Sequence, residues 1–97
     1  MLGVVIQSFT GKQAELVWGR RHSRKLGPEI QRAAYRKLLI LDAADDINDL
    51  RVPPGNRLEK LVGDRKGQHS IRINDQWRIC FVWTASGPRD VEITDYH

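Results

Sequence analysis

The last three residues carry side chains suited to proton transfer. They are Asp95, Tyr96 and His97, and they directly follow a strand-like run. A histidine with an ordinary pKa of about 6.5 can give or take a proton at neutral pH. A tyrosine can donate a hydrogen bond or stack on a nucleobase. The tripeptide therefore predicts a reactive group, although chain ends are more often polar residues without a role.

Arg78 is the second candidate, because its position in a strand pattern calls for a partner. Residues 68–73 and 76–83 alternate with period two and are separated by Asn74-Asp75, which predicts a hairpin. Within the second run the large apolar side chains alternate with Arg78, Cys80 and Val82. A charged side chain in a central strand needs a partner. Arg78 is therefore predicted to have a functional role at least as readily as a chance position in the strand.

Further polar residues can join Arg78 if the strands pair in register. Alternation places Arg72 and Tyr96 on the same face of the sheet as Arg78. Glu59 lies between Leu58 and Leu61, which could anchor their segment and leave the carboxylate turned toward that face. The alternative is that Arg72 and Glu59 are solvent-exposed residues of a strand and a loop. His69 is interpreted as a packing or hydrogen-bonding residue rather than a catalytic one.

The elements that position these residues follow from hydrophobic period and from capping residues. We expect a strand at residues 4–9, a short helix at 12–18, a long helix from Pro28 to Ala44, a helical turn capped by Asp45 or Asp46 that ends near Leu50, and three antiparallel strands after residue 67. The prediction is an α+β fold over residues 1–97, one domain with N-terminal helices packed on a small, mainly antiparallel sheet. The first strand is expected to join that sheet.

Composition limits the function classes. The 97 residues include 16 Lys and Arg against 12 Asp and Glu, for a net charge of +4. Such a balance favours polyanionic partners, RNA or DNA first. Cys80 stands alone in an apolar run, which fits a reduced, buried thiol inside the cell. No apolar stretch approaches a membrane span, so a cytoplasmic protein without membrane contact is expected.

The sequence does not contain a pattern typical of a metal site or a cofactor site. His22, His69 and His97 have no Cys or carboxylate at metal-ligand spacing. Residues 63–67 hold two glycines and a lysine, but they lack the fingerprint of a phosphate-binding loop. We therefore expect neither a metal site nor a cofactor.

Three segments in a fixed order resemble a known family. They are PPGNRLEKL at 53–61, GDRKGQHSIRINDQWR at 63–78 and the terminal Asp-Tyr-His. Together they resemble the HigB branch of the RelE superfamily of bacterial toxins, over nearly the whole chain. The resemblance implies a RelE-like toxin of a type II toxin–antitoxin system that cuts mRNA in the ribosomal A site and inhibits translation. It also implies a HigA-like helix-turn-helix antitoxin, the ribosome as partner, and operator DNA bound only through the antitoxin complex.

The resemblance also implies roles for residues. Arg78 matches an arginine that contacts the scissile phosphate, and His97 matches the C-terminal histidine of proton transfer. Tyr96 and Asp95 match the residues that flank this histidine, and Tyr96 would orient the phosphate or stack on a base.

Two further positions match less closely. Glu59 falls where some relatives have a glutamate base and other HigB toxins have a histidine. Arg72 matches a basic strand position that would assist Arg78. The implied reaction is metal-free, with Glu59 as base and His97 as acid. Val62 and His69 depart from the pattern, since a lysine and a tryptophan are frequent at those places.

Two other functions stay open at this point. One is a non-catalytic inhibitor of the same fold, like the ParE branch that poisons DNA gyrase, which would not need Glu59, Arg78 and His97. The other is a basic RNA-binding module, in which these polar residues only decorate a surface.

Overall fold

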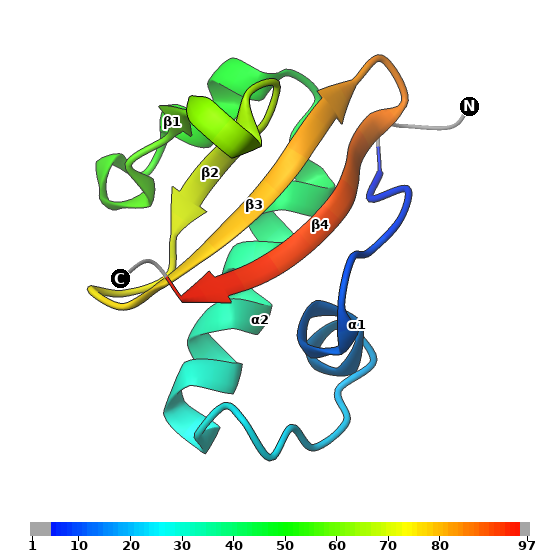
Figure 1. Ribbon diagram of the computed structural model, residues 1–97, viewed down its shortest axis with the longest axis vertical. Coiled ribbons are helices and arrows are strands. Elements are labelled where there is room, and N and C mark those ends of the chain that lie inside the picture. The colour runs from blue at the N-terminus through cyan, green and yellow to red at the C-terminus, as the bar shows by residue number, and fades with distance from the viewer. Residues whose placement is uncertain (1–4, 96–97) are drawn as a thin grey trace.

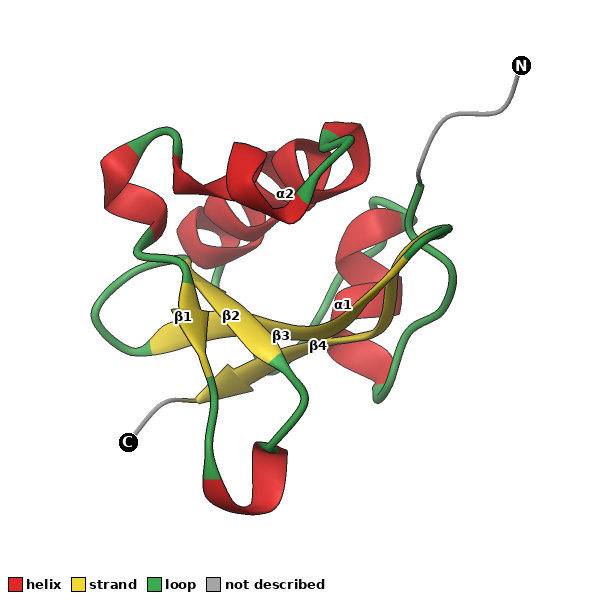
Figure 2. Ribbon diagram, turned by 90° about the horizontal axis from the view of Figure 1, so that it is seen from above, coloured by secondary structure: helices red, strands yellow, loops and turns green. Residues whose placement is uncertain are grey.

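Two α-helices pack on one four-stranded antiparallel sheet. The computed structural model describes residues 5–95. The sheet has the strand order β1-β2-β3-β4, with β1 at Glu59–Lys60, β2 at His69–Arg72, β3 at Trp77–Thr84 and β4 at Gly87–Asp95. Figure 1 shows α2 behind the sheet, and Figure 2 shows α2 on one side and the connection from β1 to β2 on the other. The predicted α+β architecture is confirmed.

Both α-helices begin and end close to the predicted residues. The first, α1, spans Lys12–Trp18, and α2 spans Pro28–Ala43. Proline occupies the first turn of α2, where its missing N–H costs no hydrogen bond. Ala34, Leu38 and Leu41 are buried at helical spacing and face the sheet. No helix among residues 5–95 is long and apolar enough to cross a membrane.

Two short 3-10 turns link α2 to the sheet, and a third lies between β1 and β2. The linking turns are η1 at Ile47–Arg51 and η2 at Pro54–Asn56, and the third is η3 at Gly63–Arg65. Asp46 caps η1, because its carboxylate accepts a hydrogen bond from the Asn48 backbone N–H at 2.8 Å. The predicted helical turn is thus confirmed, and Asp46 rather than Asp45 is its cap.

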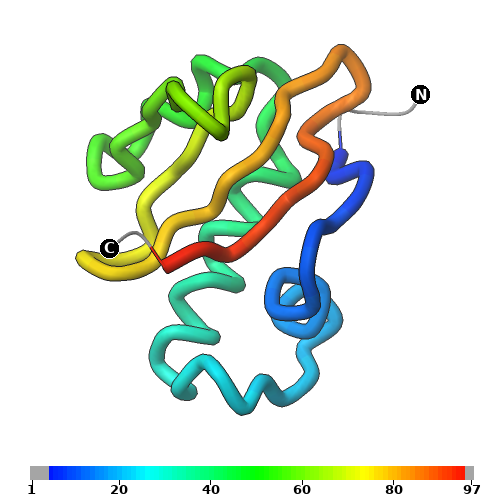
Figure 3. The backbone as a smooth tube through the Cα atoms, viewed as in Figure 1, coloured from blue at the N-terminus to red at the C-terminus, as the bar shows by residue number. Residues whose placement is uncertain are grey.

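The predicted first strand is only partly correct. Residues 5–10 run parallel to the far edge of β4 (Figure 3), but Phe9 and Val91 form the single bridge in this segment. The backbone N–H groups of Val5, Gln7 and Thr10 donate to the carbonyls of Ser86, Pro88 and Val91, so the segment is hydrogen-bonded along β4. The Ile6 N–H points to the other side and donates to an Asp42 carboxylate oxygen of α2 at 2.9 Å. Asp90 has a left-handed φ of 52°, which also interrupts the edge that residues 5–10 would extend.

The core lies between the sheet and the helices. The apolar side chains of the alternating strands form it, as predicted, and Ile71, Ile79 and Phe81 are fully buried there. Cys80 points to the other face and is also buried. Burial raises the pKa of the Cys80 thiol, although its hydrogen bond with the Thr94 side chain acts in the opposite direction. The thiol therefore stays protonated at neutral pH and packs like a small apolar group.

Asn56 braces the loop that leads into β1. Its side chain is fully buried. The amide donates to the backbone carbonyls of Leu50 and Val52, each at 3.2 Å. The Asn56 side-chain oxygen accepts a hydrogen bond from the ammonium of Lys37 on α2. One side chain thus ties the loop to the helix layer before the chain enters the sheet.

We predict that Asn56→Ala lowers the free energy of unfolding by about 1 to 3 kcal/mol, because buried carbonyls and the Lys37 ammonium lose their partner. Urea unfolding measures the loss. Asn48→Ala is the matched control: Asn48 is exposed and its side chain accepts only from Arg51, at 3.1 Å, so its loss should stay within about 0.5 kcal/mol. Equal stabilities of the two variants would contradict the bracing role.

Candidate functional site

The face of the sheet turned away from α2 carries the polar residues. The strand register sets Arg72 opposite Arg78, and Arg78 opposite Thr94. It also sets Glu59 opposite Ser70. Residues that are paired across antiparallel strands point to the same face. The predicted sharing of one face by Arg72 and Arg78 is therefore confirmed.

Arg78 is buried and held by several partners. Its residue exposure is 4%. The guanidinium Nε donates to the Ser70 hydroxyl at 2.8 Å, and Nη2 donates to the Arg57 carbonyl at 2.7 Å. Nη2 also forms an ion pair with Glu59 Oε1 at 3.1 Å. A buried charge is tolerated only when it is paired and hydrogen-bonded, and these contacts meet that condition. The expectation that Arg78 has a partner is confirmed.

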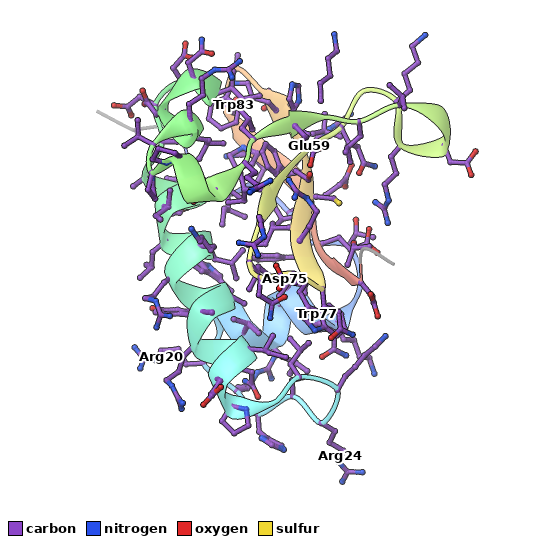
Figure 4. The ribbon with its side chains drawn as sticks, turned by 90° about the vertical axis from the view of Figure 1, so that its left-hand side faces the viewer. Arg20, Arg24, Glu59, Asp75, Trp77 and Trp83 are labelled. Carbon is purple, nitrogen blue, oxygen red and sulfur yellow. The ribbon has the colours of Figure 1, made fainter. Side chains whose placement is uncertain are left out.

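Glu59 stands at the edge of the sheet beside Arg78. Figure 4 shows Glu59 on the side of the sheet away from α2. Its side chain is 47% exposed, whereas the Arg78 side chain with which it pairs is 5% exposed. Leu61 is buried and Leu58 is packed on the core, so both anchor the segment as predicted. The two-residue strand β1 was not predicted, and it is the element that sets Glu59 above Ser70.

Arg72 and Asp95 lie at the end of the sheet nearest the hairpin turn. The Arg72 guanidinium pairs with Asp75 in that turn. Asp95 accepts a hydrogen bond from the Gln76 side chain at 3.1 Å. The remaining predicted site residues, Tyr96 and His97, lie outside the described residues.

A pocket of about 380 Å³ opens next to the Glu59–Arg78 pair. It lies between the β1–β2 connection and β4, and is lined by Glu59, Lys60, Leu61, Val62, Asp64, Arg65, Cys80, Thr94 and Asp95. Arg65 fixes the connection against β4, because its Nη1 donates to Glu92 Oε1 at 3.1 Å and to Gln68 Oε1 at 3.0 Å. Glu59 and Asp95 both line the pocket, whereas Arg72 and Arg78, which the sequence placed on the same face as Glu59, do not line it.

Four residues of this site were missed from the sequence: Ser70, Arg65, Glu92 and Arg57. Ser70, which holds Arg78, shares its strand face by simple alternation and could have been found. The Arg65–Glu92 pair joins residues from separate elements, so no local pattern indicates it. The orientation of the Arg57 carbonyl depends on a left-handed backbone φ of 45° at Arg57. This conformation is uncommon for a non-glycine residue, so the sequence does not predict it.

His69 packs as predicted. Its ring stacks on Phe81 with a centroid distance of 6.3 Å and an interplanar angle of 23°. Burial lowers the pKa of His69 below its ordinary value, and the positive charges of Lys60 and Arg51 lower it further. The ring is therefore neutral at physiological pH and does not add to the positive charge of the site.

Within residues 5–95, no three side chains of His, Cys, Asp or Glu gather to hold a metal ion. The chemistry available from the described geometry is therefore that of a fixed guanidinium next to a solvent-exposed carboxylate. Such a pair can bind an oxyanion and accept a proton from a neighbouring hydroxyl.

Comparison with known proteins identifies the family. The chain is 53% identical over 64 residues to Toxin HigB-1 of Vibrio cholerae, over 66% of each chain. It is 39% identical over 66 residues to an uncharacterized protein of Haemophilus influenzae, over 68% of this chain and 64% of that protein. These matches span slightly less than two thirds of the length of each relative. Residues 7–97 match a family model described as "RelE-like toxin of type II toxin-antitoxin system HigB". The chain therefore belongs to the HigB-like toxins of type II toxin–antitoxin systems.

Proposed function

We propose that this toxin is a ribosome-dependent endoribonuclease that cleaves mRNA in the A site by metal-independent acid–base chemistry. The observation that carries the proposal is the 3.1 Å ion pair between Glu59 and the buried Arg78. In RNA, the 2′-hydroxyl is directly adjacent to the scissile phosphate. A base for the hydroxyl and a donor for the phosphate must therefore lie side by side, as these two groups do.

The reaction follows from this adjacency. Glu59 removes the proton of the 2′-hydroxyl, and the 2′-oxygen attacks the neighbouring phosphorus. The bond from phosphorus to the 5′-oxygen breaks, and His97 protonates that oxygen. The products are a 2′,3′-cyclic phosphate and a free 5′-hydroxyl, so atoms and charges balance.

Arg78 would stabilise the extra negative charge of the pentavalent phosphorus. Its guanidinium is held by Ser70 and the Arg57 carbonyl before any substrate arrives. A donor that is already oriented costs no reorganisation during the reaction, and this is the condition under which electrostatic stabilisation is strongest. Arg72 would add positive charge from the neighbouring strand, and Tyr96 would orient the phosphate or stack on a base.

Partners follow from the shape of the site and from the family. The pocket beside Glu59 is open, so the ribosome would supply the substrate geometry that the toxin itself does not impose. A HigA-like antitoxin would restrain the toxin, and operator DNA would be bound through their complex. Inhibition of DNA gyrase, the rival function, needs no carboxylate paired with a buried arginine.

We predict that Glu59→Gln slows mRNA cleavage by about 10²- to 10⁴-fold, because the amide cannot take the 2′-hydroxyl proton. Cell-free translation followed by mapping of mRNA ends measures the effect, at fixed magnesium and with transition metals removed. The parent should leave cyclic-phosphate ends at A-site codons. Glu59→Gln should retain the fold, because the glutamine side-chain oxygen can still accept from Arg78 Nη2 and the Ser70 and Arg57 contacts of Arg78 remain. Unchanged cleavage by the folded variant would exclude Glu59 as the base, and a parent that leaves mRNA intact would overturn the proposed activity.

For Arg78 the informative replacement is lysine, since alanine would also leave the buried Ser70 hydroxyl without its partner. Arg78→Lys keeps the charge but cannot hold Ser70, Arg57 and a phosphate together. Single-turnover cleavage on ribosomes should fall by about 10²- to 10³-fold. Arg89→Lys, on the exposed part of β4, is the matched control and should cut like the parent. A folded Arg78→Lys variant that keeps the parent rate would remove Arg78 from the mechanism.

The third prediction concerns His97. A His97→Gln variant keeps a polar side chain that cannot transfer a proton in this pH range, so it should bind ribosomes normally yet cut about 10²- to 10⁴-fold more slowly. Co-sedimentation with ribosomes and mapped cleavage separate binding from chemistry. Cleavage at the parent rate would mean that another group protonates the leaving 5′-oxygen.

A further inference from the structure

A second pocket, of about 380 Å³, lies at the other end of the molecule from Glu59. It is formed by the end of α1, the following loop and the first half of α2. Its lining residues are Val17, Arg20, Arg21, His22, Gln31, Arg32, Tyr35 and Arg36, and it is called here the arginine pocket. Figure 4 shows Arg20 beside α2, at the opposite end from Glu59.

The arginines of this pocket carry positive charge that no ion pair within the described residues offsets. Among residues 5–95, none of its four arginines forms an ion pair. Arg32 and Arg36 lie one helical turn apart on α2 and also line an adjoining pocket of about 400 Å³, with Glu29 and Asn74. Guanidinium groups gathered in this way repel one another until an anion binds between them.

Lys37 of α2 lies within the electrostatic influence of both the arginine pocket and the sheet. Burial lowers the pKa of Lys37 on α2, and the charges of Arg36 and Arg72 lower it further. Arg36 belongs to the arginine pocket and Arg72 to the sheet, so their fields meet at Lys37.

The strained backbone at Arg20 lies where the Arg20 side chain stacks over Tyr35 in the pocket. The Arg20 and Arg21 backbone N–H groups donate to Val17 and Leu16 carbonyls at 3.0 and 2.8 Å, which closes the end of α1 in a Schellman motif. Arg20 takes the left-handed position of this motif, with a φ of 59°, where glycine is the usual residue. Its guanidinium lies 4.9 Å from the centre of the Tyr35 ring. A strained position that holds an arginine over an aromatic ring at a pocket points to ligand binding.

The chemistry of the lining favours nucleic acid over a protein partner. Of the described residues that line the pocket, only Val17 is aliphatic, and it is buried. Cores of protein interfaces are apolar and depleted in charge, whereas interfaces with nucleic acids are polar and strongly positive. Arginine forks match phosphate oxygens, and the stacked Arg20–Tyr35 pair offers a surface to a base.

We propose that the arginine pocket binds the phosphate backbone of ribosomal RNA while mRNA occupies the catalytic face of the sheet. The two surfaces lie at opposite ends of the molecule, so a second RNA segment, rather than the mRNA strand in the catalytic site, fits this pocket. The inference rests on the proposed action of the toxin on ribosomes. It adds a surface through which the toxin would bind the ribosome, and it leaves the proposed cleavage chemistry unchanged.

The test uses Arg32→Gln/Arg36→Gln, which removes two charges from an exposed helix face with a good helix former. The control Lys12→Gln/Arg89→Gln removes the same charge from exposed residues outside the pocket. Both variants are made with Glu59→Gln, so that mRNA stays intact, and binding to purified bacterial ribosomes is measured against salt. The pocket variant should bind about tenfold more weakly or worse, with a log–log salt slope reduced by about two, whereas the control should bind like the Glu59→Gln parent.

Each outcome decides one question. Equal binding and equal salt slopes of the pocket and control variants would overturn the inference. Loss of binding to the HigA-like antitoxin, with ribosome binding intact, would also overturn it and assign the pocket to the antitoxin. If the toxin without any substitution does not cleave mRNA on ribosomes, the proposed function fails instead. Cleavage by the toxin together with unaltered binding by the pocket variant would refute only the pocket.

Discussion

The buried guanidinium of Arg78 is the constraint on which the rest of the site depends. A charge at 4% exposure is stable only while its hydrogen-bond partners remain in place. Those partners come from β2, from the loop before β1 and from β1 itself. Three segments must therefore be correctly placed for one side chain to be satisfied. The same requirement gives the site a donor whose orientation is set before substrate binds. A preoriented donor of this kind can stabilise negative charge that develops in a transition state.

The loop before β1 links this charge to the helix layer. Lys37 of α2 donates to Asn56, Asn56 donates to two loop carbonyls, and the next residue presents its own carbonyl to Arg78. The arrangement divides the molecule into two working surfaces. The sheet face carries the candidate chemistry, while the end of α1 and the first half of α2 carry four arginines that form no ion pair among residues 5–95.

Most of the fold could be predicted because its elements carry strong local patterns. Alternation between residues 68 and 83 determined which side chains share a face, so Arg72 and Arg78 were correctly placed on the same face of the sheet. β1 was missed because Glu59 and Lys60 have no strand pattern, and they form a strand only through pairing with β2. Residues 4–9 were predicted as a regular strand, but residues 5–10 form only the Phe9–Val91 bridge with β4. The left-handed φ of Asp90, which interrupts this edge, cannot be inferred from their apolar alternation. Contacts between distant segments, such as Arg65 with Glu92, depend on tertiary placement.

We propose that Glu59 and Arg78 act as one unit on adjacent atoms of the same nucleotide. A double-mutant cycle can separate joint from independent action, with single-turnover cleavage on ribosomes measured for Glu59→Gln, Arg78→Lys and the combined variant. Groups that act together lose most of their effect when either one is removed. The account predicts that the combined variant is scarcely slower than the slower single variant. Losses that multiply in the combined variant would show that the two residues act independently and would contradict the account.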